Sequence, residues 1–515
     1  TMSKTIIIIG AGLAGLSAAL QAAENGCNVK LVSFLPSERA QSVMAEGGIN
    51  AALNTKDEND SPEEHFTDTI KAACGLADPN AVWGMTQAAP ELVHWLLKLG
   101  VKFNMSGYDD VDLRNFGGQK KKRTAFAQSD TGKQIMTAMI DAVRRKEASG
   151  MVERFSHHSF LTLRLCGNIC CGCVIRDEYS QETVELPGDA VIVATGGMHG
   201  LFGNTTGSLS NTGEVTAELF RLGVPLANGE MIQYHPTTVK CGGKRMLISE
   251  AARGEGGRLF AMKDGKQWYF MEEKYPELGN LMPRDITARE IWKVSHESEV
   301  FLDMTEISEE IISNKLSGLA DDCMTYLHKD IRKEPVSVLP GIHYFMGGIL
   351  VDEQHRTPIQ NLYAAGECCA QYHGANRLGG NSLLGALYGG RVAAKSACEQ
   401  ADVVDLSCAT QIDFPTASQI SEIKQLNKVM QETMGVVRNE NTLLNGIQTV
   451  QALTGNLPLL GMAVLKSALA RKESRSAHWR EDYPKSNDDD YLKTTVARFD
   501  GKQIQISFVP VPERR

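Results

Sequence analysis

The sequence has no apolar run long enough to cross a membrane and no excess of positive charge. Aliphatic runs such as Ile6 to Ile9 are far shorter than the roughly 20 residues that a membrane-spanning helix needs. Acidic residues outnumber basic ones by 62 to 53, and the only dense basic run, Lys120 to Arg123, is expected to be a solvated face. No signal-peptide pattern is present at the N-terminus. We therefore expect a cytoplasmic protein without a nucleic-acid surface or a direct membrane span.

The chain has twelve cysteines, but their spacing does not fit a metal site. A zinc ribbon needs paired C-x-x-C units, an iron–sulfur site needs a longer cysteine run, and an attached c-type haem needs C-x-x-C-H. The cluster Cys166, Cys170, Cys171 and Cys173 instead lies in LRLCGNICCGCVIRD, which predicts two strands joined by a Gly-Asn turn. We expect buried strand thiols there and no metal centre.

Residues 5–34 predict a buried strand, a glycine turn, a helix rich in small residues and a second strand. Gly10, Gly12 and Gly15 form GxGxxG, in which the first glycine makes the turn, the second admits a pyrophosphate and the third lets the helix pack closely on the strand. The second strand ends in Ser33, where an acidic ribose-binding residue is usual for NAD. The unit predicts a dinucleotide site and favours FAD, with a nicotinamide dehydrogenase as the alternative.

Two further strand patterns, in residues 189–197 and 361–367, each precede a glycine-rich turn, so three distant segments are expected in one sheet. The predicted fold is α/β, with a Rossmann-like FAD-binding domain formed by residues 1–229 and 341–410. An inserted α+β capping domain is predicted over 230–340, and a C-terminal helical domain with its tail over 411–515. In this last domain the run Asp488 to Asp490 is expected to be a solvated loop.

The stretch HGANRLGGNSLLGALYGG, residues 373–390, places Arg377 beside glycines that open a helix. Gly379 and Gly380 let the backbone approach a ligand, and Asn381 and Ser382 suit an N-cap. The N-terminus of the following helix attracts negative charge. The pattern therefore indicates an anion site.

The inserted block and the segment after it carry further polar motifs beside glycine or proline: QYHPT (233–237), ISEAARGEGG (248–257), MPRD (282–285) and HYFMGG (343–348). With Arg377, they offer two histidines and a hydroxyl that could hold a dicarboxylate. Arg377 would form a bidentate fork on one carboxylate beside His343, and His235 and Ser249 would take the other.

The chain resembles one family over nearly its whole length. The motifs that carry the resemblance occur in unbroken order: GAGLAG, the EGG loop at 46–48, RNFGGQ at 114–119, ATGG, QYHPT, SEAARGEGG, PRD, HYFMGG, AAGE, GANRLGGNSLLG and SRSAHWREDYP. This family comprises the flavoprotein subunits of fumarate reductase and succinate dehydrogenase, with L-aspartate oxidase as a close relative. The resemblance implies FAD between the two domains, hydride transfer between flavin N5 and an alkene carbon, and Arg284 as the proton donor. Glu250 and Arg253, which share a helical face, would relay the proton.

The resemblance also assigns ligands. It implies substrate contacts from His235, Ser249, His343, Arg377 and Phe116. It implies cofactor contacts from Gly10, Gly12, Gly15, Ser33, Ser42, Gly47, Gly48, Glu214, Glu367, Asn381, Ser382 and Leu383. Respiratory members attach FAD covalently through a histidine five residues before the EGG glutamate, and Gln41 stands at that position. An amide cannot form that bond, so we expect non-covalent FAD. Because the covalent bond is associated with a higher flavin potential in this family, its absence favours reduction of fumarate, or oxidation of a more easily oxidised substrate, over oxidation of succinate.

The alternatives within the family are L-aspartate oxidase and a succinate dehydrogenase flavoprotein subunit. L-Aspartate oxidase typically carries a glutamate where Phe116 stands, and a phenyl ring offers no anionic partner for a substrate ammonium. We therefore predict an FAD-dependent reductase that converts fumarate to succinate, and a non-catalytic flavin scaffold is the hypothesis from another class. Because the chain has no cluster ligands or haem motif, its electrons would come from a separate iron–sulfur subunit or another donor.

Overall fold

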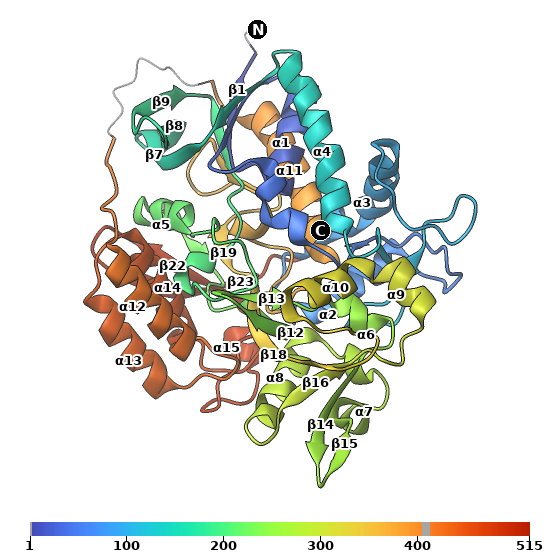
Figure 1. Ribbon diagram of the computed structural model, residues 1–515. Helices are drawn as coiled ribbons and strands as arrows, with labels where there is room; N and C mark the ends of the chain where they lie inside the picture. The colour runs from blue at the N-terminus through green and yellow to red at the C-terminus, as the bar shows by residue number, and fades with distance from the viewer. Residues whose placement is uncertain (1–2, 404–411) are drawn as a thin grey trace.

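The computed structural model describes residues 3–403 and 412–515, which are arranged in three parts (Figure 1). The first part is organised by a parallel five-stranded sheet in the order β20-β10-β1-β2-β6. Its strands are β1 (Thr5–Ile9), β2 (Asn28–Ser33), β6 (Val152–Ser156), β10 (Ala190–Val193) and β20 (Leu362–Ala364). Three distant segments thus return to one sheet, which confirms the predicted α/β class.

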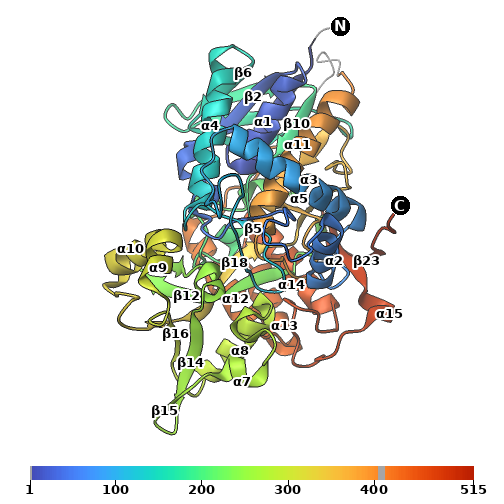
Figure 2. The same cartoon turned by 90° about the vertical axis from the view of Figure 1, so that its right-hand side faces the viewer.

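Helices cover one face of this sheet and a smaller sheet covers the other (Figures 1 and 2). The helices are α1 (Leu13–Glu24), α3 (Pro79–Lys98), α4 (Thr131–Ala148) and α11 (Asn381–Gln400), with α2 (Pro62–Ala72) beside α3. The smaller sheet contains β7 (His158–Cys166), β8 (Ile169–Asp177) and β9 (Thr183–Pro187). Small residues let α1 and α11 pack closely, since a Cβ on Gly390 would lie 2.4 Å from the Ala14 carbonyl oxygen.

The predicted glycine turn is present between β1 and α1. Gly10 has a φ of 110°, a conformation that favours glycine. A Cβ on Gly15 would lie 1.8 Å from the Gly10 carbonyl oxygen, so only glycine lets the helix start this close to the strand.

The capping part lies at the lower end of the molecule in Figure 1. One sheet contains β13 (Lys244–Leu247), β12 (Ile232–Cys241) and β18 (Leu339–Phe345), and a second contains β15 (Lys266–Trp268), β14 (Arg258–Lys263), β16 (Val300–Asp303) and β17 (Val336–Ser337). Its helices are α6 (Glu250–Gly254), α7 (Phe270–Lys274), α8 (Arg284–Ser295), α9 (Glu309–Lys315) and α10 (Ser317–Asp322). The proposed domain boundary at 340 falls within β18.

The C-terminal part contains α12 (Ile420–Thr433), α13 (Glu440–Gln451) and α14 (Asn456–Ala470), followed by the short helix α15 (Asp488–Tyr491). It also contains a hairpin of β22 (Lys493–Phe499) and β23 (Ile504–Pro510), which the sequence analysis did not predict. This hairpin extends a sheet with β11 (Leu226–Ala227), β19 (Gly348–Leu350) and β21 (Cys369–Ala370). The last part of the chain is therefore joined to segments before and after the capping part. The proposed boundary between 410 and 411 lies outside the described residues.

Two sequence expectations are wrong. Arg123 is not on a solvated face, because it is fully buried and its guanidinium pairs with Asp60 at 2.8 Å and Asp68 at 2.7 Å. Asp488 to Asp490 are exposed as expected, but they form the short helix α15 (Asp488–Tyr491), which Asn487 caps. The partners of Arg123 are distant in sequence, which explains why the local basic run was misleading.

The cysteine cluster lies on paired strands, as predicted. β7 and β8 pair across the Gly167–Asn168 turn, and Cys170, Cys171 and Cys173 are buried. The expected buried thiol is wrong at Cys166, which is only partly buried and is disulfide-bonded. No group of histidine, cysteine and carboxylate side chains suited to a metal ion occurs within residues 3–403 and 412–515. Over the same ranges, every helix is too short or too polar to span a bilayer.

The close contact between Gly15 and Gly10 gives a prediction for stability. Gly15→Ala should lower the free energy of unfolding by about 2 kcal/mol or more, because the added methyl forces α1 away from β1. Gly243→Ala is the matched control, since a Cβ there meets nothing within 4 Å. Thermal unfolding of the two variants compares them, and equal midpoints would contradict the prediction.

Candidate functional site

A cavity of about 1150 Å³ lies where the three parts meet. It is lined by most of the predicted site residues: Gly10, Gly12, Ser33, Ser42, Gly47, Gly48, Phe116, Glu214, His235, Ser249, Glu250, Arg284, His343, Glu367, Arg377, Ser382 and Leu383. Gly15, Arg253 and Asn381 are not in the lining and lie behind it. Segments that are widely separated in sequence are thus brought together around one space.

One end of the cavity fits a dinucleotide. Gly10 and Gly12 leave the N-terminus of α1 open, and the Ser42 hydroxyl accepts a hydrogen bond from the Leu13 amide at 3.2 Å. The Ser33 hydroxyl is buried and has no hydrogen-bond partner among the described residues, so a ligand hydroxyl could satisfy it. Such a buried orphan oxygen at the end of β2 suits a ribose.

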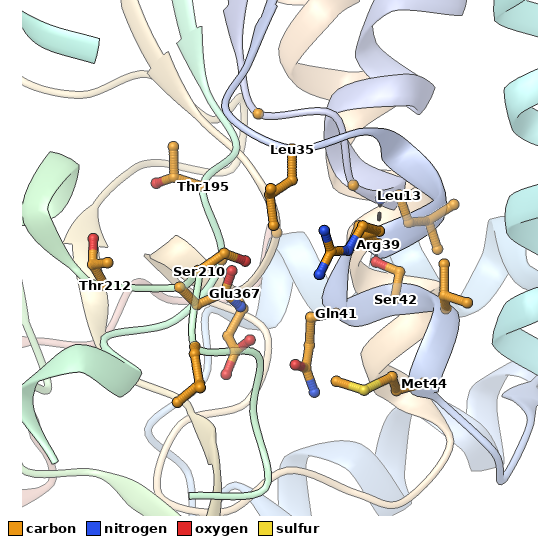
Figure 3. A pocket seen from close by; sticks show the side chains of 18 of the residues that line it. Leu13, Leu35, Arg39, Gln41, Ser42, Met44, Thr195, Ser210, Thr212 and Glu367 are labelled. Carbon is orange, nitrogen blue, oxygen red and sulfur yellow. Dashed lines mark hydrogen bonds between the residues drawn. The ribbon is translucent and has the colours of Figure 1, made fainter. Parts of the chain in front are cut away.

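Sequence reasoning missed Arg39, which enters this part of the cavity. Figure 3 shows Arg39 and Gln41 projecting from one wall toward Ser210 and Glu367 on the other. A cation next to the glycine turn suits a pyrophosphate. No sequence signal marked Arg39, because it ends a short 3-10 helix (Ser37–Arg39) after β2, which is too short to give a periodic pattern.

An arginine–glutamate pair forms the other end of the site. Arg284 is the first residue of α8, and its Nε and Nη2 donate to Glu250 Oε2 at 2.8 Å and 2.6 Å. Its Nη1 donates to Gln233 Oε1 at 3.0 Å. Burial raises the pKa of the Glu250 carboxyl, but Arg284, Arg253 and hydrogen bonds outweigh this effect and hold that pKa below its usual value. Glu250 is therefore an anion at neutral pH.

Arg253 lies behind Glu250 on the short helix α6. Its Nη1 donates to the Asn280 carbonyl oxygen at 2.8 Å, while its Nε and Nη2 are buried without a partner among the described residues. Burial lowers the pKa of Arg253 to about 10. Arg253 is thus a buried cation with two nitrogens unpaired within the described part of the chain, and the nearby negative charge of Glu250 stabilises its charged form. These properties suit a residue that relays protons.

Two histidines, His235 and His343, lie near Arg284. His235 on β12 and His343 on β18 come from paired strands, and their ring centroids are 5.2 Å apart. Burial, together with Arg284, lowers the pKa of both histidines well below the usual range, so both are neutral. His235 Nε2 is buried without a partner among the described residues. His343 Nδ1 lies 2.6 Å from the Thr206 hydroxyl.

Arg377 completes the positive wall of the cavity. Its guanidinium stacks 4.3 Å from the centre of the Tyr344 ring, and its Nε is buried without a partner among the described residues. Burial and the nearby Arg284 lower its pKa to about 9.

Ser249 and Phe116 also line the cavity. Ser249 is the N-cap of α6, and its hydroxyl accepts a hydrogen bond from the Ala251 amide at 3.2 Å. Phe116 is buried against the position of Gly47.

The expected N-cap of α11 is wrong. The helix begins at Asn381, and the capping position is Gly380, with a φ of 88°. The Asn381 side chain is instead held by Asn50 at 2.8 Å, His65 at 2.9 Å and Thr69 at 3.0 Å. Asn50 also donates to the Gly379 carbonyl oxygen at 2.7 Å, so this buried network orients the glycine loop.

Glu367, Gln41 and Glu214 also line the cavity. Glu367 accepts from the Phe345 amide at 3.1 Å and lies 3.3 Å from His199. Gln41 accepts a hydrogen bond from the Ser208 amide. Burial raises the pKa of Glu214, the first residue of α5 (Glu214–Arg221).

Comparisons with known proteins agree with this geometry. The family described as FAD binding domain matches residues 5–383, and the one described as Fumarate reductase flavoprotein C-term matches residues 453–514. The succinate dehydrogenase flavoprotein subunit of Bacillus subtilis is 37% identical over 99% of this chain and 98% of its own length. The chain belongs to the succinate dehydrogenase and fumarate reductase flavoprotein family. Its members are FAD-dependent oxidoreductases, and the family and enzyme class predicted from the motifs are thereby confirmed.

Fumarate reductases of this family are also similar to the chain. The 8-methylmenaquinol:fumarate reductase flavoprotein subunit of Wolinella succinogenes is 32% identical over 100% of this chain and 92% of its own length. Among solved structures, an E. coli quinol fumarate reductase superposes with a TM-score of 0.89 at 27% identity, covering 99% of this chain and 97% of that chain. The fold of FAD-binding, capping and C-terminal parts is therefore that of the family.

Proposed function

We propose that this flavoprotein reduces a C4 dicarboxylate and converts fumarate to succinate. The observation that carries the proposal is the wall of buried arginines and neutral histidines that shares one cavity with the dinucleotide turn. FAD, held by the residues around Gly10, Ser33 and Ser42, supplies the hydride when it is bound. The side chains of the chain supply substrate binding and the proton.

Charge selects the substrate class. Arg253, Arg284 and Arg377 are all buried, and Glu250 is the carboxylate paired with them at this end of the cavity. Because His235 and His343 are neutral, these four ionised groups leave two positive charges. A dianion balances them, whereas a monoanion leaves a buried charge uncompensated.

The geometry gives each substrate ligand a role. Arg377, stacked on Tyr344, presents a planar fork suited to one carboxylate. His235 Nε2 and the Ser249 hydroxyl face the same cavity and suit the second carboxylate, and His343 lies beside them. Phe116 adds an apolar wall that excludes water and offers no anionic partner to an ammonium group. This wall favours a dicarboxylate over an amino acid.

Arg284 is the proposed proton donor. Glu250 and Gln233 fix three of its guanidinium nitrogens, so its orientation toward the cavity is defined before the substrate binds. After Arg284 gives its proton to the substrate carbon, Arg253 gives a proton to the Glu250 carboxylate, Glu250 passes it to Arg284, and Arg253 regains a proton from solvent. The adjacent cations favour loss of the proton, because like charges destabilise the charged form.

Gln41 is proposed to leave FAD unattached. Its side-chain oxygen bonds the Ser208 amide, and an amide does not form the covalent link that a histidine forms. Electrons are proposed to come from a separate iron–sulfur subunit or another donor, since the Bacillus subtilis and Wolinella succinogenes relatives are named as flavoprotein subunits.

Succinate oxidation is the second candidate, and the similarity to the Bacillus subtilis succinate dehydrogenase subunit favours it. The same residues serve both directions, because a donor in reduction is an acceptor in oxidation. Assays of both directions with artificial electron donors and acceptors separate the two candidates.

The first test concerns Arg284. The wild-type protein should oxidise a reduced viologen dye when fumarate is added, and Arg284→Ala should lower kcat by about 100-fold or more, because the proton donor is lost. Arg258→Ala is the control, since Arg258 forms a half-exposed ion pair with Glu272. An undiminished rate in Arg284→Ala, or no rate in the wild type, would overturn the proposal.

The second test uses pH. Arg377 with its pKa near 9 is charged below that pH and neutral above it. Since fumarate stays fully ionised, kcat/KM for fumarate should be constant from neutral pH to about pH 9 and then fall by about tenfold per pH unit. A profile that stays flat to strongly alkaline pH would show that Arg377 does not provide the binding charge.

The third test concerns the cofactor. Acid precipitation of the purified protein should leave the flavin in the supernatant, because Gln41 provides no covalent bond. Gln41→His provides the comparison, as it restores the side chain that the respiratory enzymes use. Flavin that stays with the wild-type pellet would refute non-covalent binding.

A further inference from the structure

Two glycines outside the capping part enclose the carboxylate of Glu250. The Gly117 amide donates to Glu250 Oε1 at 2.6 Å. A Cβ on Gly117 would lie 2.3 Å from Oε1, and a Cβ on Gly379 would lie 2.5 Å from Oε2. We call this pair the glycine notch. Any side chain at either position would occupy the place of the carboxylate.

The backbone itself does not require glycine at these positions. Neither Gly117 nor Gly379 has a positive φ, in contrast to the neighbouring Gly118 and Gly380. An alanine would therefore fit the backbone conformation of both residues. The Glu250 carboxylate is the group nearest to a Cβ at both positions; the next neighbours are the Met282 carbonyl oxygen, 3.1 Å from a Cβ on Gly117, and the Phe116 ring, 3.0 Å from a Cβ on Gly379.

The notch joins two parts of the molecule. Gly117 lies between β4 (Leu113–Arg114) and β5 (Thr124–Ala125), and Gly379 lies just before α11, so both belong to the part that binds the dinucleotide. Glu250 belongs to the capping part. Other bonds cross the same boundary nearby, including Gly118 to the Leu281 carbonyl at 3.1 Å and Asn376 to Asp285 at 3.0 Å.

The notch divides the two oxygens of Glu250 between two tasks. Gly117 occupies Oε1, which leaves Oε2 to hold both Nε and Nη2 of Arg284. A carboxylate fixed at one oxygen cannot rotate freely, so Arg284 is held in one orientation. If the capping part moved away, Glu250 would lose the Gly117 bond while keeping its contacts within the capping part.

We propose that Gly117 and Gly379 are positioning residues that complete the proton relay only when the capping part is seated on the dinucleotide-binding part. The inference rests on the proposed function, since it concerns the relay through Glu250 and Arg284. It adds that substrate enclosure and proton delivery are coupled by one interdomain contact. The relay would thus be complete only in the state in which the cavity is closed to solvent.

The test compares Gly117→Ala, Gly379→Ala and Gly107→Ala in the full-length, FAD-loaded protein. Gly107 is exposed, and a Cβ there would meet only Asp110, at 3.8 Å, which makes it the matched control. Hydrogen exchange measured by mass spectrometry reports the amides of residues 248–254. Both notch variants should speed this exchange by about tenfold or more, because Glu250 no longer seats, and Gly107→Ala should not change it.

Kinetics supply the second measurement. Each notch variant should lower kcat for fumarate by about tenfold or more with KM changed by less than about threefold, because the carboxylate ligands remain while the proton donor is misplaced. Unchanged exchange in both variants, an unchanged kcat, or a KM that rises as far as kcat falls would overturn the inference. If the wild type shows no fumarate reduction, the proposed function fails, and the exchange comparison still decides whether the notch holds Glu250.

A rescue variant distinguishes a clash between the added methyl group and Glu250 from a general loss of folding. Combining Gly117→Ala with Glu250→Asp shortens the acidic side chain by one methylene and withdraws it from the added methyl group. The double variant should regain FAD content and the slow exchange of residues 248–254. Failure to regain either would show that the lesion of Gly117→Ala does not act through Glu250, and would overturn the inference.

Discussion

Burying three arginines at one end of a cavity is the constraint on which the site depends. Burial makes the charged forms of Arg253 and Arg377 less favourable and lowers the pKa of both, and the positive charge of Arg284 adds to this cost. Glu250 offsets part of this cost, and the two histidines avoid adding to it by staying neutral. In the proposed function, a dicarboxylate substrate offsets the remainder. Affinity for the substrate and the arrangement of the protein side chains thus have the same electrostatic origin.

Local sequence patterns predicted the strand–turn–helix unit at the start of the dinucleotide-binding part, because neighbouring residues determine it. The strand, turn and helix around Gly10, Gly12 and Gly15 follow from hydrophobic runs and glycine spacing. The C-terminal hairpin was missed although Asp500 and Gly501 separate two runs of alternating character, which is a strong hairpin signal. That omission was avoidable from the sequence.

Features that depend on distant partners could not be predicted in this way. Arg123 is buried because Asp60 and Asp68 meet it, and Asn381 faces Asn50, His65 and Thr69 instead of capping its helix. Similarly, the motifs indicated that Glu250 and Arg284 act together, but not that Gln233 holds the third guanidinium nitrogen. Motif resemblance supplies the candidate site residues, while the bonds that orient them arise only from the tertiary fold.

The mixed sheet β21-β19-β11-β22-β23 has a consequence for biosynthesis. Its strand β11 is made before the capping part, and its neighbour β22 is made only after that part. Until then, the edge of β11 that later pairs with β22 has no permanent partner, and such edges promote aggregation in nascent chains. This sheet can therefore be completed only after β22 has been synthesised, and a truncated product that lacks the β22–β23 hairpin would expose the edge of β11 to chaperones and proteases.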